Sequence, residues 1–318
     1  MVCNSCVIQN EQEKEKRYKS LPKDKEDNMI RSIVTTFFFG MALISAAPAA
    51  ATPFFFSTGD PDGLIGTAAR PTSGGKIEIE TGDDFILNAP TNINTVTFVG
   101  LLTNGTDVSD LGNLHLEMYR VFPKDSEVGR TSGPPDFSTS QVPTRVNSPS
   151  DVAFQERDLG EGDFMLTTSV PVPFTVANSV INGINPKPNQ FTGGEGQMTG
   201  LEVVFTASFS NPFSLPADHY FFVPQVEVNG GEFLWLSAPK PITGGTGPFN
   251  PDLQSWIRNE NLAPDWLRIG TDITQQGPFN AAFSLTGIVV PEPSTLFLLG
   301  SGIILARITR GKKQRLAS

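Results

Sequence analysis

Apolar and polar residues alternate along much of the middle of the chain. Residues 201–209 place Leu, Val, Phe, Ala and Phe at every second position, and residues 76–80 alternate isoleucine with lysine and glutamate. A period of two puts the apolar side chains on one face of a β-strand and the polar ones on the other. Both stretches therefore predict half-buried strands.

Similar but less regular stretches predict further strands, separated by glycine, proline, asparagine and aspartate. They are residues 84–87, 95–102, 114–122, 164–174, 220–228, 233–237 and 281–290. The turn Asn229-Gly230-Gly231 predicts a hairpin between strands 220–228 and 233–237. Pro224 lacks a backbone donor and predicts that its strand lies at a sheet edge or carries a bulge. The one short helix is expected at residues 251–259.

No long amphipathic helix interrupts this series, which disfavours βαβ architectures. We therefore predict an all-β fold for residues 52–290, as a two-sheet antiparallel sandwich of jelly-roll-like form. Residues 124–149 and 182–200 are rich in Pro, Ser, Thr, Asn and Gly, and are expected to form long loops.

A different pattern occupies the C-terminal residues 291–318. Pro291-Glu292-Pro293 precedes an apolar run at residues 294–306, and the run ends at a basic tail. As a helix this run rises about 20 Å, less than the roughly 30 Å of a bilayer core, which predicts a short transmembrane sorting helix. The basic residues of the expected stop-transfer tail are Arg307, Arg310, Lys312, Lys313 and Arg315.

The N-terminal part predicts export. Arg31, the apolar run at residues 33–47 and the small residues up to Ala51 have the order of a secretory signal peptide over residues 29–51. Signal peptidase is expected to read Ala49 and Ala51 and to cut after Ala51. Residues 1–28 mix lysine, arginine and acidic residues, unlike a signal peptide, and are interpreted as a misassigned or unstructured leader with translation starting at Met29.

The order of Pro-Glu-Pro, apolar helix and basic end resembles the PEP-CTERM sorting signal of Gram-negative bacteria. Residues 56–63, 77–85 and 263–272 also resemble segments of exported PEP-CTERM proteins whose function is unassigned. The resemblance implies passage through the secretion machinery, a transient inner-membrane intermediate and cutting near the tripeptide by an exosortase, a membrane-embedded transpeptidase-like enzyme. It also implies a final place at the cell surface or in an extracellular matrix, where exopolysaccharide is an expected partner.

Charge and cysteine content narrow the range of functions. Residues 52–290 hold eleven lysines and arginines against twenty-six acidic residues, and the whole chain has a formal net charge of −10. Nucleic-acid binding is disfavoured because it depends on neutralising phosphates. Cys3 and Cys6 lie in the leader, so the exported region is expected to fold without disulfides.

Catalytic signals are few. His115 and His219 lie outside any nucleophile motif and are interpreted as surface or turn histidines. A glycosidase needs only two facing carboxylates and remains an alternative, with catalysis by an unidentified pair. Asp83 and Asp84 are not that pair, because neighbours on a strand point to opposite faces.

Ligand-binding candidates are also sparse. Asp60 and Asp62 offer oxygen ligands within a Pro-Gly turn and form a weak calcium candidate, but a type I turn without metal is the favoured interpretation. No other cofactor is expected. Trp256 and Trp266 are the candidate aromatics for stacking on a sugar, whereas Trp235 is expected in the core.

These observations predict a non-enzymatic exported protein that associates with exopolysaccharide. The alternatives are a glycosidase-like enzyme and a structural or adhesive matrix component without a defined ligand. An open cleft of carboxylates would favour the enzyme, and an exposed aromatic row would favour the sugar binder.

Overall fold

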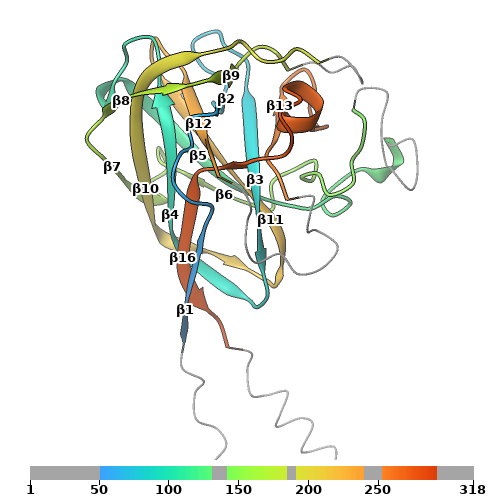
Figure 1. Ribbon diagram of the computed structural model, residues 1–318. Helices are drawn as coiled ribbons and strands as arrows, with labels where there is room; N and C mark the ends of the chain where they lie inside the picture. Colours follow the sequence, from blue (N-terminus) through green and yellow to red (C-terminus); the bar gives the residue numbers. More distant parts are fainter. Residues whose placement is uncertain (1–50, 131–141, 185–190, 240–252, 292–318) are drawn as a thin grey trace, which may run out of the picture. The chain divides into compact units, whose positions relative to one another are not determined.

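The computed structural model describes residues 51–130, 142–184, 191–239 and 253–291 (Figure 1). These residues form one compact unit, Ala51–Pro291. No helix within the described ranges is long and apolar enough to cross a membrane. The predicted leader, signal peptide and sorting helix lie outside the described residues, apart from Ala51 and Pro291.

The predicted all-β sandwich is confirmed, with two sheets of ten and six strands. The larger sheet has the order β1 (Thr52–Ser57), β16 (Phe283–Val289), β4 (Thr91–Leu102), β12 (Phe233–Ala238), β2 (Ile65–Ala68) and β9 (Asn178–Val180). β10 (Met198–Leu215) pairs with β4, β7 (Phe164–Thr168) and β8 (Val172–Val176), and β15 (Asn280–Ala281) pairs with β12. The pairs are antiparallel except for β2 with β9.

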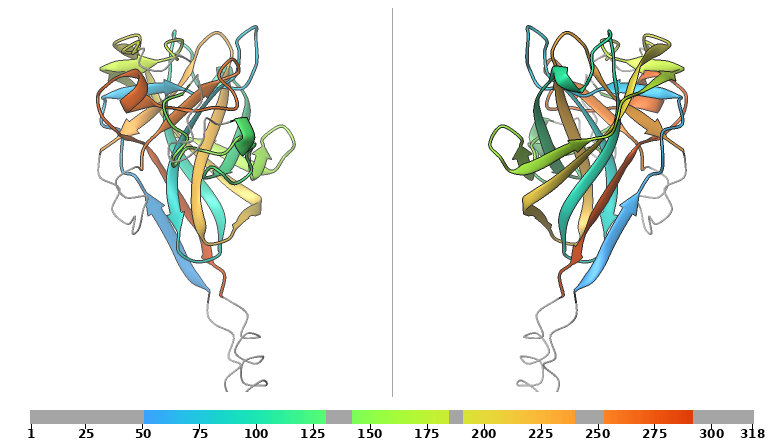
Figure 2. Two further views of the ribbon diagram at one scale, coloured as in Figure 1. Left: turned by 90° about the vertical axis from the view of Figure 1, so that its right-hand side faces the viewer. Right: turned by 90° about the vertical axis from the view of Figure 1, so that its left-hand side faces the viewer.

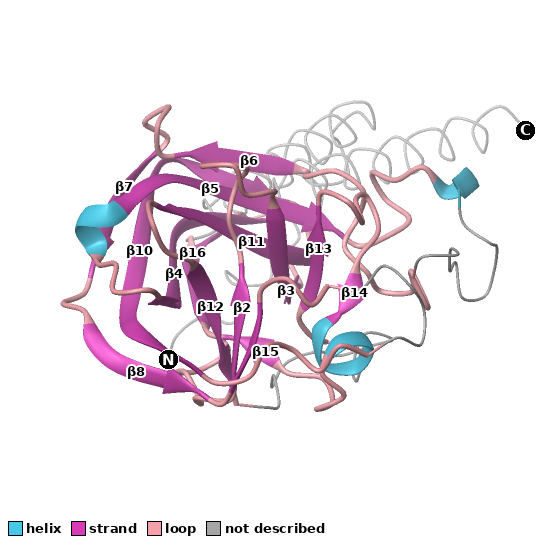
Figure 3. Ribbon diagram, turned by 90° about the horizontal axis from the view of Figure 1, so that it is seen from above, coloured by secondary structure: helices cyan, strands magenta, loops and turns pink. Residues whose placement is uncertain are grey.

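The smaller sheet has the order β14 (Leu267–Arg268), β13 (Trp256–Asn259), β3 (Ile79–Leu87), β11 (Asp218–Val228), β5 (Leu111–Arg120) and β6 (Gln155–Asp158). The 3₁₀ turns η1 (Val108–Asp110) and η2 (Val128–Arg130) and the π-helical turn η3 (Ile269–Ile273) lie at the periphery of the strands (Figure 3).

The main core lies between the two sheets and is rich in phenylalanine. Phe98 of β4 stacks on Phe205 of β10 with ring centroids 5.1 Å apart, and both contact Phe233 of β12 edge-on. Phe222 of β11 reaches this cluster from the opposite sheet. The alternation of residues 201–209 therefore predicted the buried face of β10 correctly from Val203 onward.

The six-stranded sheet is buried on its outer face as well. Tyr220 and Phe222 of β11 face the main core, whereas Phe221 and Val223 pack with Trp256 and other residues on the outer side. β11 is thus covered on both faces, which explains its nearly continuous apolar run. Residues 145–154 and 256–266 supply much of this cover.

The predicted hairpin between residues 220–228 and 233–237 is wrong. β11 belongs to the smaller sheet and β12 to the larger one, so the turn at Asn229 to Gly231 connects the two layers. Thr103, the residue after β4, holds this connection, because its hydroxyl accepts the N–H of Glu232 at 3.1 Å. Turn chemistry alone does not distinguish a hairpin from a crossing between sheets.

Pro224 lies in an interior strand and not at the predicted edge, but the strand carries the alternative that was predicted, an irregularity of the bulge type between Val226 and Val228. β3 pairs with β11 only as far as Phe222, and β5 pairs along the other side. Val226 donates its N–H to the carbonyl of Ala69, away from β5, so the nitrogen of Pro224 points to the same side. The missing donor falls where the pairing with β3 has ended.

Other strand boundaries also differ from the prediction. Residues 76–80 and 84–87 were predicted as two strands, but β3 runs unbroken from Ile79 and leaves Ile77 37% exposed. Residues 164–174 break into β7 and β8, which pair with successive parts of β10. Within the expected helix at 251–259, residues 256–259 form strand β13 instead, because they pair with β3 and β14.

Candidate functional site

The two ends of the described chain meet at one end of the sandwich. Thr52, the first residue of β1, is the register partner of Val289, the last residue of β16. Figure 2 shows β1 and β16 running side by side to this end. A cut after Ala51 would therefore leave the new N-terminus beside the segment that leads into Pro291.

Among the described residues, the backbone hydrogen bond nearest the C-terminal end lies one residue before the Pro-Glu-Pro tripeptide. Val290 donates its N–H to the carbonyl of Pro90 at 2.7 Å. Val289 pairs with Thr91 of β4 as well as with Thr52 of β1. The chain is therefore held by neighbours on both sides up to the point where the predicted sorting signal begins.

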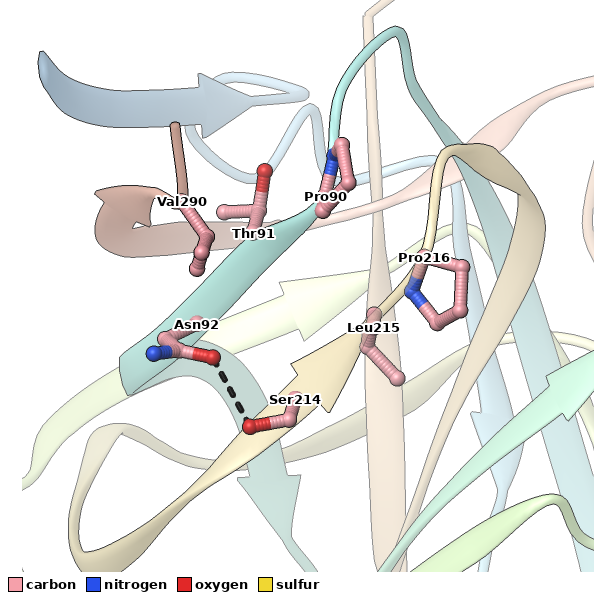
Figure 4. Close-up of a pocket in the computed structure, with 7 residues that line it drawn as sticks. All are labelled: Pro90, Thr91, Asn92, Ser214, Leu215, Pro216 and Val290. Carbon is pink, nitrogen blue, oxygen red and sulfur yellow. Dashed lines mark hydrogen bonds between the residues drawn. The ribbon is translucent and has the colours of Figure 1, made fainter. Parts of the chain in front are cut away.

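A hollow of about 470 Å³ opens beside this point (Figure 4). Its lining contains Pro90, Thr91, Asn92, Ser214, Leu215, Pro216 and Val290. Ser214 donates its hydroxyl hydrogen to Asn92 Oδ1 at 2.8 Å, which ties the end of β10 to the start of β4. We call the hollow and the adjoining ends of β1 and β16 the terminal pole.

The remaining residues of the predicted processing sites lie outside the described residues. They are Ala49, Glu292, Pro293, Arg307, Arg310, Lys312, Lys313 and Arg315. Of the predicted processing residues, Ala51 and Pro291 are described. Ala51 is exposed and Pro291 is half-buried, so the two are accessible at the terminal pole.

The predicted ligand aromatics are not at a surface. Trp256 is 1% exposed and Trp266 is 0% exposed. Trp266 donates its Nε1–H to the carbonyl of Ser150 at 3.0 Å and packs edge-on against Tyr119. These two rings cover the outer face of the smaller sheet, and this burial contradicts their predicted role in stacking on a sugar.

The weak calcium candidate is held by protein hydrogen bonds. Asp62 accepts the N–H of Leu64 at 3.0 Å and the hydroxyl of Ser237 at 2.5 Å. Asp60 is exposed. Among the described residues, no group of three or more His, Cys, Asp or Glu side chains is arranged to hold a metal ion.

Several charged side chains gather on the outer face of the smaller sheet. Arg258 of β13 lies opposite Glu80 of β3 in register, and its Nη2 donates to Glu80 Oε1 at 2.8 Å. The Tyr119 hydroxyl donates to the same carboxylate at 2.7 Å. The guanidinium also stacks over Trp266, 4.4 Å from the ring centroid. We call Glu80, Tyr119 and Arg258, with Glu78 and Glu117 beside them, the Arg258 network.

Two carboxylates of this network are hard to ionise. Burial, reinforced by the charge of Glu80, raises the pKa of Glu117 to about 8. Burial and the same neighbour also raise the pKa of Glu78. Gln225 donates to Glu117 Oε2 at 3.1 Å. A carboxylic acid that stays protonated near neutral pH is the type of group that a general acid requires, although structural ion networks produce the same shift.

A second buried ion cluster supports the cover of this face. Arg145 is fully buried, and its two terminal nitrogens donate to Asp265 at 2.6 Å and Asp151 at 2.7 Å. The pair with Asp265 joins this loop segment to the residues before β14, and the pair with Asp151 lies within the loop segment. Sequence reasoning missed both clusters, because the central pairs Arg145 with Asp265 and Arg258 with Glu80 join residues 120 and 178 positions apart that share no motif.

The two histidines differ in their surroundings. The ring of His115 is partly exposed and its Nδ1 lies 2.7 Å from Asp158, in agreement with the predicted surface position. His219 is buried, with Nε2 2.7 Å from Asp84 Oδ2, so its predicted surface position is wrong. Burial lowers the pKa of His219 to about 4.

Asp83 points to the other face from Asp84, as predicted for neighbours on a strand. Its Oδ2 accepts the N–H of Ala281 at 2.6 Å. Burial and the charge of Asp84 raise its pKa well above the usual range. The two neighbouring carboxylates therefore form hydrogen bonds on opposite sides of β3, Asp83 with Ala281 and Asp84 with His219.

Comparison with protein families matches residues 289–313 to the PEP-CTERM protein-sorting motif. The match begins at the last residue of β16, within the terminal pole. This motif implies export, membrane-associated sorting toward the cell surface and processing by an exosortase. Searches of curated proteins and of solved structures each found no match.

Proposed function

The chain carries a PEP-CTERM sorting motif, and we propose that its sandwich is a non-enzymatic component of the cell surface or extracellular matrix, released there by cutting near Pro291-Glu292-Pro293. The observation that carries the proposal is the position of the motif. The folded domain is hydrogen-bonded through Val290, and the tripeptide follows directly. A cut at the tripeptide would therefore leave the sandwich intact.

The burial of the charged clusters supports a non-enzymatic role. Glu80 is neutralised by Arg258 and hydrogen-bonded by Tyr119. Asp265 and Asp151 are paired with Arg145 in the same way. These contacts fix the cover of the smaller sheet, which is a structural task for the carboxylates.

We also propose that the domain associates with exopolysaccharide. A second hollow, of about 320 Å³, has several polar groups among its lining residues: Arg70, Asn182, Asn259 and Asn261. Amides and a guanidinium can bind sugar hydroxyls without stacking. A glycan array on the purified protein tests this, with Asn261→Ala as the binding variant and the exposed Asn211→Ala as the matched control. We expect the first variant alone to lose signal, and equal signals would argue against this hollow.

The alternative function is glycoside hydrolysis, which the raised pKa of Glu117 favours. A general acid is needed to protonate the leaving oxygen, so Glu117→Gln would abolish such an activity. If the wild-type protein releases sugar from an exopolysaccharide preparation and Glu117→Gln does not, the enzymatic alternative replaces the proposal.

Cell fractionation tests the sorting proposal. We expect wild-type protein to be cut and to leave the inner membrane. Changing Pro291-Glu292-Pro293 to three alanines leaves the apolar run and basic tail intact, so the uncut chain should accumulate in the membrane. Deleting residues 294–318 should instead release a soluble periplasmic protein. Equal release of the wild type and the three-alanine variant would show that the tripeptide is only a linker.

A further inference from the structure

The tripeptide follows the folded domain so closely in the chain that an enzyme which reaches it also contacts the terminal pole. The backbone of Val290 is fixed to Pro90. An extended chain advances at most about 3.6 Å per residue, so an enzyme that cuts at Glu292 works within about 7 Å of Val290. It must therefore meet the folded domain there.

Peeling the end of β16 away from the domain is an unfavourable way to gain room. Val289 is paired with Thr52 on one side and with Thr91 on the other. Opening this end would break backbone pairing with two neighbouring strands and expose their hydrogen-bonding groups. The folded pole itself is the surface that an approaching enzyme contacts.

The chemistry of this surface is apolar and uncharged. None of the seven residues that line the hollow is charged. Four of them are apolar, namely Pro90, Leu215, Pro216 and Val290, and three are polar. Ile288 of β16 is 41% exposed, and Val290, which follows the end of β16, is 37% exposed. A neutral apolar surface beside the point where the chain enters its membrane-directed segment fits a partner that is itself membrane-embedded.

We propose that the hollow lined by Asn92, Ser214 and Val290 is a docking surface for the enzyme that cuts the sorting motif. The inference rests on the proposed function and adds that the enzyme recognises the folded pole together with the tripeptide. Its occupant is an uncharged, apolar surface segment of that enzyme.

The test measures the rate at which precursor converts to the processed form, by pulse-chase labelling of the full-length chain in the host bacterium. Ser214→Lys places a charge in the hollow, and Ser210→Lys places the same charge at another exposed position of β10. Burying an unpaired ammonium group at a contact costs more than the about 1.4 kcal/mol that corresponds to a tenfold rate change. We expect processing of Ser214→Lys to be at least about tenfold slower and that of Ser210→Lys to be unchanged.

A second variant leaves every residue of the hollow in place. A Gly-Ser linker of about eight residues between Val290 and Pro291 separates the tripeptide from the hollow by up to about 28 Å. Processing should slow if the enzyme needs both together. Limited proteolysis of each precursor after detergent extraction confirms that its domain is folded.

The three-alanine variant of the tripeptide separates the two proposals in the same experiment. If it is blocked while Ser214→Lys and the linker variant are processed at the wild-type rate, the docking surface is wrong and the sorting proposal stands. If it is processed normally, both proposals fail. Faster processing of Ser214→Lys would show that the chain's own tripeptide segment fills the hollow, which also overturns docking by the enzyme.

Discussion

The Arg258 network and the terminal pole show opposite uses of the surface of this sandwich. In the network, charged groups are covered by Trp266 and paired with one another, as in the contact of Arg258 with Glu80. At the pole, Ile288 and Val290 remain exposed and carry no charge. The carboxylates of the network most resemble an active site, yet they are more buried than the residues of the terminal pole. The region that leads into the sorting motif is the more accessible one.

Titratable residues alone are therefore a poor guide to where such a protein meets its partners. The ion pair of the network joins β13 to β3 within the smaller sheet, and the separate pair of Arg145 with Asp265 holds a loop segment against that sheet. The pole carries few ionisable groups but has the position and exposure that a processing enzyme requires.

Arg258→Met should have the largest effect on stability. The substitution leaves Glu80 buried at 3% exposure without its cationic partner. Loss of one partner of a buried ion pair typically costs about 3–5 kcal/mol. Urea unfolding of the purified protein measures the change in the free energy of unfolding.

The double variant Glu80→Gln with Arg258→Met is the control for this interpretation. It removes the uncompensated charge, so it should be more stable than Arg258→Met alone. If the single substitution costs less than about 1 kcal/mol, the network is not the structural element described here.

Glu117→Gln should change how stability depends on pH. The pKa of Glu117 in the folded protein is about 8, above the ordinary value of 4.5, so the folded state binds its proton more tightly than the unfolded state. Stability from this group is therefore present below about pH 4.5 and declines as pH rises to about 8. Removing the ionisable group should stabilise the protein by about 1–3 kcal/mol at pH 9 and should have little effect at pH 5.

Urea unfolding of the wild type and of Glu117→Gln, each at pH 5 and at pH 9, measures this difference in the free energy of unfolding. The glutamine keeps an oxygen that can accept the hydrogen bond from Gln225. An equal effect at both pH values would indicate that packing, and not ionisation, distinguishes the two side chains.

Much of the sandwich was predictable from residues 201–209 and similar stretches, because alternation is a local property of a strand. The pairing of strands was not. The turn after β11 has hairpin chemistry but crosses between the sheets, and residues 256–259 form a strand only through contact with β3 and β14. Long-range pairing decides both, and no local pattern encodes it.

The candidate sites also divide into one that was predictable from sequence and one that depends on contacts between distant residues. The sorting motif was predictable because its tripeptide, apolar run and basic tail are contiguous in the sequence. The hollow of the terminal pole was not, because Asn92 and Ser214 are 122 residues apart and ordinary in sequence. Trp266 illustrates the reverse error, since a tryptophan that the sequence offers for sugar binding has its Nε1–H bonded to Ser150 in the interior.

Phe55→Ser should have the smallest effect on stability. Phe55 of β1 is 71% exposed near the terminal pole, so its removal exposes little new surface. Exposed substitutions of this kind usually change the free energy of unfolding by less than about 0.5 kcal/mol. A loss above about 2 kcal/mol in the same urea assay would mean that β1 is covered in the folded protein.

The most direct test of the account is the mass of the protein at its final location. Intact mass spectrometry with terminal sequencing, applied to protein from the cell surface or the surrounding medium, identifies both ends of the chain. We predict a chain that begins at Thr52 and ends close to Pro291-Glu292-Pro293, with the sandwich whole between two cuts at one pole. Surface protein that still carries the basic tail through Ser318 would contradict processing at the motif.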